Sequence, residues 1–98
     1  MRRDEILRFL SEHRAELERF GVKSLAFFGS VARDEAQEDS DVDILVEFTA
    51  PPGFIRFMDL RFFLEDLLGC RVDLVTRQAL KPRLRSRVER EAVHVPGF

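Results

Sequence analysis

The sequence predicts an α/β protein in which helices pack on a small β-sheet. Three observations support this fold class: apolar residues recur at helical spacing near the N-terminus, short segments farther along have strand periodicity, and helical stretches separate those strands. The predicted order is helix, strand, helix, strand, helix, strand, helix. Because 98 residues form one modest core, we expect a single domain spanning residues 1–98.

The N-terminal part is predicted to contain a helix, a strand and a second, short helix. The first helix extends over 3–20, and its apolar face is formed by Ile6, Leu10, Leu17 and Phe20. Gly21 follows as the C-terminal cap of that helix. Residues 25–28 are an apolar run that indicates a buried strand, and a short helix is expected after Gly29 and Ser30.

The central part is predicted to contain a strand and a helix. Between 42 and 48, apolar residues at every second position give the strand one fully apolar face: Val42, Ile44, Val46 and Phe48. The run Pro51-Pro52-Gly53 then breaks the chain. A helix dense in Phe and Leu is expected over 55–68, and Gly69 ends it.

The C-terminal part is predicted to add a strand, a helix and a short edge strand. The strand covers 71–76, with Val72 and Leu74 on one side and Asp73 on the other. Pro82 fits the first turn of the last helix, where its missing N–H costs nothing. Residues 93–95 are expected to form the edge strand.

Composition and charge limit the classes of function. The net charge of −2 indicates no bulk attraction to nucleic acid, so no direct nucleic-acid partner is expected. Cys70 is the only cysteine, which excludes an intrachain disulfide. The N-terminus lacks the apolar core of a signal peptide, and no apolar run approaches the ~20 residues that cross a bilayer. We therefore expect a cytoplasmic protein without a membrane partner.

Three aspartates on predicted strands are the candidate catalytic and metal-binding residues. Asp41 and Asp43 are two positions apart, so both side chains leave the same face of their strand. Such a pair is tolerated when a divalent cation lies between the carboxylates or when both point into water. Asp73 lies in an otherwise apolar strand and would join them if the strands are neighbours. The alternative is that Asp73 forms a structural ion pair with Arg71 or Arg77.

A second feature points to phosphate chemistry. Gly29 and Ser30 follow a buried strand, where backbone N–H groups and a hydroxyl can bind a phosphate. Ser30 is also a suitable helix N-cap, which would be a purely structural role. A phosphate-binding turn followed by metal-binding carboxylates supplies the parts that phosphoryl transfer requires.

The sequence resembles the minimal nucleotidyltransferases, or MNT proteins, of the DNA polymerase β superfamily. The resemblance rests on Gly29-Ser30-Val31-Ala32-Arg33, Ser40-Asp41-Val42-Asp43 and Val72-Asp73-Leu74-Val75, and it covers almost the whole chain. It implies a mixed sheet flanked by helices, with Gly29 and Ser30 touching the triphosphate. It further implies that Asp41, Asp43 and Asp73 hold two Mg²⁺ ions, with ATP as the substrate.

Separate expectations apply to three residues close to these motifs: Arg33, Asp34 and Ser40. The family usually has Gly after the Arg, and here Asp34 stands there. Arg33 is a candidate nucleotide-binding residue, and an ion pair with acids such as Glu35 is the alternative. Ser40 is the other candidate nucleotide-binding residue, and it is also expected to orient the turn that presents Asp41.

The resemblance implies a partner protein as well. Many MNT proteins are the antitoxin half of a pair whose toxin is a helical HEPN-type ribonuclease, and they are thought to adenylylate it. The leading hypothesis is therefore a Mg²⁺-dependent transfer of AMP to such a toxin, with a homo- or hetero-oligomer possible. The alternative is a non-catalytic binding module that occludes the toxin. It is motivated by the small size and by the Phe-rich segment around Phe54, Phe57, Phe62 and Phe63.

Overall fold

The molecule is built on a four-stranded mixed sheet with the strand order β3-β2-β1-β4. The strands are β1 (Val22–Phe28), β2 (Val42–Phe48), β3 (Val72–Thr76) and β4 (Val93–His94). Strand β2 pairs antiparallel with β1 and parallel with β3, and β4 pairs antiparallel with β1. The computed structural model describes residues 2–37 and 40–98. It confirms the predicted α/β class and the mixed sheet.

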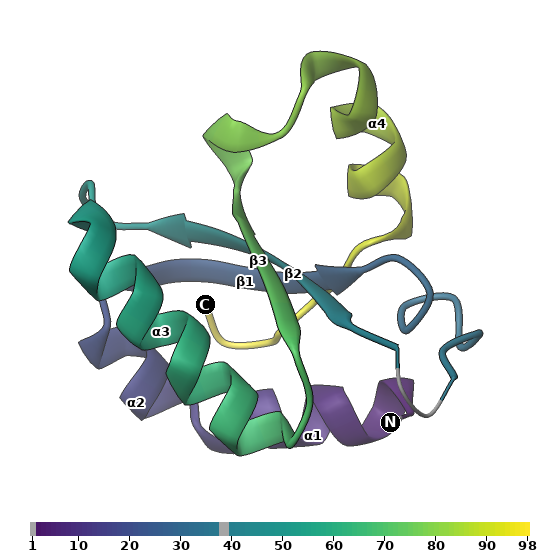
Figure 1. Ribbon diagram of the computed structural model, residues 1–98, viewed down its shortest axis with the longest axis horizontal. Coiled ribbons are helices and arrows are strands. Elements are labelled where there is room, and N and C mark those ends of the chain that lie inside the picture. The colour runs from purple at the N-terminus through teal and green to yellow at the C-terminus, as the bar shows by residue number, and fades with distance from the viewer. Residues whose placement is uncertain (1, 38–39) are drawn as a thin grey trace.

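Helices cover both faces of this sheet. Figure 1 shows α1 (Arg3–Glu12), α2 (Arg14–Arg19) and α3 (Gly53–Leu68) on one face and α4 (Pro82–Glu91) on the other. A single turn of 3₁₀ helix, η1 (Arg77–Ala79), leads from β3 toward α4. No helix within the described residues is both long enough and apolar enough to pass through a membrane.

Strand β2 separates two apolar clusters. Val42, Ile44 and Val46 belong to the larger core, which lies on the side of α1, α2 and α3. Leu45 belongs to a smaller cluster that includes Leu80 and Val88, with Phe28 and Val75 packed against it. Because neighbouring strand residues point to opposite faces, Asp43, the aspartate of β2, lies on the face that α4 partly covers.

The predicted helix over 3–20 is wrong in one respect, because the chain forms two helices that meet at His13. Nδ1 of His13 donates a hydrogen bond to the Phe9 carbonyl oxygen over 2.8 Å. A side chain that bonds the backbone of the preceding turn competes with regular helix geometry. The backbone at His13 accordingly leaves the helical region, with φ −107° and ψ 21°.

The short helix predicted after Ser30 is not formed. The chain makes turns there instead: the N–H groups of Ala32 and Arg33 both donate to the Gly29 carbonyl oxygen. At Asp34 the backbone adopts φ +59°, which a right-handed helix cannot continue through. The helices over 53–68 and 82–91 and the edge strand at 93–94 do form, close to their predicted ranges.

Candidate active site

The strand register brings Asp43, Asp73 and Gly29 to one end of the sheet. Asp43 is the direct partner of Asp73 in the parallel pair and of Phe28 in the antiparallel pair. Gly29 follows Phe28, with φ +73°, and a Cβ added there would collide with Oδ2 of Asp43. The close approach of the turn to this carboxylate therefore requires glycine, both for its conformation and for space.

The electrostatics of Asp43 favour a cation. Its carboxyl group is partly buried, and this burial, with the negative charges of Asp73 and Asp41 and a hydrogen bond with Asp73, raises its pKa to about 6. The carboxylate is thus disfavoured by dehydration and by like charges. A divalent cation would relieve both effects, and Mg²⁺ commonly takes one or two carboxylates together with substrate phosphates.

Asp41 lies near this pair but has a different partner. Its Oδ1 is 3.2 Å from Nε of Arg71 in an exposed ion pair. Within residues 2–37 and 40–98, no three His, Cys, Asp or Glu side chains are grouped closely enough to hold a metal ion together. Asp43 and Asp73 are therefore the two carboxylates that meet, while Asp41 contributes negative charge from the side.

The structural alternative for Asp73 is not realised. Arg71 pairs with Asp41, and Arg77 pairs with Glu47 and Glu89 at 3.4 and 2.7 Å. No ion pair involving Asp73 is formed among the residues described. The exposed Asp73 carboxylate therefore remains available beside Asp43.

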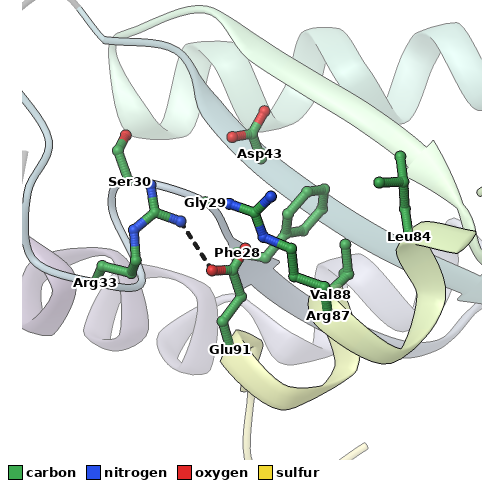
Figure 2. Close-up of a pocket in the computed structure, with 9 residues that line it drawn as sticks. All are labelled: Phe28, Gly29, Ser30, Arg33, Asp43, Leu84, Arg87, Val88 and Glu91. Atoms are coloured by element: carbon green, nitrogen blue, oxygen red, sulfur yellow. Dashed lines mark hydrogen bonds and ion pairs between the residues drawn. The ribbon is translucent and has the colours of Figure 1, made fainter.

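A cleft of about 410 Å³ opens between the Gly29 turn and α4. Figure 2 shows its lining side chains, which come from β1, the turn, β2 and α4. They are Phe28, Gly29, Ser30, Arg33, Asp43, Leu84, Arg87, Val88 and Glu91. Sequence reasoning named Gly29, Ser30, Arg33 and Asp43 as site residues but none of the residues on α4. The run of Arg residues after position 77 was the available signal, although a solvated helix face explains most such runs.

Arg33 and Ser40 have structural partners. Arg33 lies at the cleft, but its Nη1 is 2.8 Å from Glu91 and its Nε is 3.2 Å from Glu35, as the ion-pair alternative expected. Ser40 is not among the described residues that line the cleft; its Oγ accepts a hydrogen bond from the Gln37 N–H over 2.9 Å. Ser40 thus shapes the approach to Asp41.

Comparisons with known proteins show the family and the fold. A family model described as a nucleotidyltransferase domain matches residues 7–95. The protein adenylyltransferase MntA of Thermococcus cleftensis is 50% identical over 93 residues, covering 94% of each chain. A solved structure described as a minimal nucleotidyltransferase superposes with a TM-score of 0.80 at 45% identity, covering 95% of each chain.

A more distantly related solved structure has a similar fold. A chain in the solved complex of the tri-AMPylated Shewanella oneidensis HEPN toxin with an MNT antitoxin superposes with a TM-score of 0.67. At 20% identity, covering 94% of this chain and 73% of that one, this similarity concerns the fold alone.

Proposed function

Because this chain belongs to the nucleotidyltransferase domain family, we propose that it transfers AMP from ATP to a HEPN-type toxin, as the antitoxin of a toxin–antitoxin pair. The observation that carries the proposal is one cleft in which Gly29 and Ser30 lie beside Asp43, itself paired with Asp73. The 50% identical relative that is named a protein adenylyltransferase supports the choice of AMP and of a protein acceptor.

The carboxylates fit Mg²⁺, and two ions would be held by Asp43 and Asp73 with help from Asp41. Two features support this fit: the crowding of negative charge at Asp43 and the absence of room for a Cβ between it and the Gly29 turn. Bound Mg²⁺ neutralises phosphate oxygens and the charge that develops on them during transfer.

The remaining steps are the binding of the triphosphate by residues of this chain and the transfer reaction between the two substrates. Gly29 N–H and the Ser30 hydroxyl would bind and orient the triphosphate. The acceptor hydroxyl oxygen then bonds to the α-phosphorus and its proton passes to water, while the bond from that phosphorus to the bridging oxygen breaks with its electron pair and pyrophosphate leaves. The sequence contains no Tyr, so a tyrosine acceptor would have to lie on another chain.

The test uses ATP labelled at the α-phosphate, Mg²⁺ and, as the candidate toxin, the protein encoded by the neighbouring gene. We expect label on the toxin, lost with EDTA, and a rate at least ~100-fold lower for Asp43→Asn and Asp73→Asn. Asp4→Asn, at an exposed position of α1 away from the cleft and from the exposed apolar side chains of α3, is the matched control and should transfer label normally. Absence of label with every nucleotide and metal tried would sink the proposal.

A second candidate is neutralisation by binding alone. Exposed apolar side chains on α3 favour it: Phe54 is 77% exposed, Ile55 74% and Phe62 54%. Such side chains are common in protein interfaces. An Asp43→Asn variant distinguishes the two candidates, because a binding module would still neutralise the toxin in cells and an enzyme would not.

A further inference from the structure

Arg87 extends from α4 into the cleft and has no role in the function proposed above. It lines the cleft together with Gly29, Ser30 and Asp43, and Figure 2 shows its guanidinium group reaching toward the Gly29 turn. In the part of the chain that the structure describes, no ion pair includes Arg87. A guanidinium group in this situation favours an anionic ligand.

Arg33, another cationic side chain that lines the cleft, is already paired with carboxylates. Its guanidinium group donates to Glu91 over 2.8 Å and to Glu35 over 3.2 Å. Two carboxylates therefore compensate its charge, and an incoming phosphate would have to displace them. Arg87 requires no such exchange, since the described residues provide it with no carboxylate partner.

Two contacts made by neighbouring residues of α4 hold the backbone of Arg87 in place. Val88, the next residue, is buried in the cluster that contains Leu45 and Leu80. Glu91, one turn later on α4, ties that helix to Arg33 and so to the Gly29 turn. A cation on a backbone held in this way loses less freedom when it binds a ligand than one on a mobile segment.

We propose that Arg87 binds the β- and γ-phosphates of the nucleoside triphosphate, the part that leaves as pyrophosphate. This inference rests on the proposed function and adds a residue that selects triphosphates. When the acceptor oxygen bonds to the α-phosphorus, the electron pair of the broken bond remains on the pyrophosphate oxygen. The planar guanidinium group donates paired N–H bonds to phosphate oxygens and stabilises that charge.

The experiment compares the binding of ATP and of AMP, each with Mg²⁺, by isothermal titration calorimetry. For Arg87→Ala we expect ATP affinity to fall about 10- to 100-fold while AMP affinity stays within about 2-fold, because AMP lacks the phosphates that Arg87 binds. Arg87→Lys should recover part of the ATP affinity through its charge. Arg83→Ala, exposed on the same helix and outside the cleft lining, is the matched control and should bind ATP normally.

Each outcome has a distinct meaning. Unchanged ATP affinity in a folded Arg87→Ala variant, checked by thermal unfolding, would overturn the role of Arg87 and leave the proposed function intact. Equal losses for ATP and AMP would also overturn it, since they indicate a general change in the cleft. Failure of the wild-type protein to bind ATP or label the toxin would instead overturn the proposed function, and this inference with it.

Discussion

Asp34 is the residue whose backbone conformation departs most from the preference of its side chain. Its φ of +59° lies in the left-handed region, and the other described residues with positive φ are glycines. Asp tolerates this region better than most residues, yet glycine occupies it without steric cost. The resemblance to the minimal nucleotidyltransferases leads us to expect Gly at this position, and the conformation gives the physical reason.

We therefore predict that Asp34→Gly raises the free energy of unfolding by about 0.5 kcal/mol. Relief of the backbone strain exceeds the entropy that glycine adds to the unfolded chain by this small margin. Asp34→Val should lower the free energy by about 1–2 kcal/mol, because a β-branched side chain fits this region poorly. Urea unfolding of the three proteins gives the comparison, and equal stability of the Gly and Val variants would contradict the prediction.

Asp43 predicts a pH dependence of stability in the metal-free protein. Its folded pKa of about 6 lies above the ordinary value of 3.8. Folding therefore favours the protonated form, and the contribution of that proton is complete below pH 3.8 and lost as the pH rises through 6. At pH 7.5, Asp43→Asn should raise the free energy of unfolding by about 1 kcal/mol, less than the full shift implies because the group is partly solvated.

The measurement is urea unfolding in EDTA at pH 7.5 and near pH 3.8. The gain from Asp43→Asn should be present at the higher pH and nearly absent at the lower one. Asp59→Asn serves as the comparison at both pH values. A gain of the same size at both would mean that the amide stabilises the fold by some other route.

At the scale of elements, α3 supports the strand that carries Asp73. The Glu65 carboxylate accepts a hydrogen bond from the Val72 N–H over 3.0 Å, and Nε of Arg61 donates to the Val72 carbonyl oxygen over 3.2 Å. Strand β3 is an edge strand, so its outer backbone groups lack a strand partner. These side chains satisfy the backbone directly before Asp73.

We predict that Glu65→Ala lowers the free energy of unfolding by about 1–2 kcal/mol, since the partly buried Val72 N–H loses its acceptor. Transfer activity should fall as well, because the strand that presents Asp73 is less firmly held. Glu65→Gln retains an acceptor oxygen and should remain close to the wild-type protein in urea unfolding. A Gln variant as unstable as the Ala variant would show that charge, and not the hydrogen bond, is responsible.

The sequence predicted most elements because their signals are local. The alternation in 42–48 and the Gly69 cap depend on neighbouring residues only. The helix predicted after Ser30 is wrong because Asp34 takes a left-handed conformation, and the only signal for it was the Gly that the resemblance leads us to expect there. The break at His13 escaped prediction for a similar reason, since it depends on one side-chain bond to the Phe9 carbonyl oxygen.

The residues of the candidate site also divide into those that the local sequence predicts and those that depend on distant packing. Asp43 and Asp73 were predictable from their strands, given that the strands are neighbours. Arg87 was not, because its position in the cleft depends on the packing of α4 across the sheet from a distant part of the chain. On sequence alone, it was one Arg in a helix rich in Arg.

At the scale of the whole molecule, the cleft and the exposed start of α3 lie at opposite ends of the sheet. Asp43, which lines the cleft, is the second residue of β2. Figure 1 shows that α3 begins beyond the other end of that strand. Phe54 and Ile55 are exposed at the start of α3. Phe63 has a different environment, because its ring packs against Phe20 with 5.2 Å between centroids.

This separation predicts that substitutions of the exposed apolar side chains on α3 leave ATP binding unchanged. The combined variant Phe54→Ser, Ile55→Ser and Phe62→Ser should change the free energy of unfolding by less than about 1 kcal/mol and leave ATP affinity unchanged, because exposed side chains contribute little packing. Phe63→Ser should cost about 2 kcal/mol, since it removes a packed ring. Urea unfolding and calorimetry measure both quantities. If the combined variant lost ATP binding, the two ends of the sheet would be coupled, and its effect on toxin neutralisation would no longer report on α3 alone.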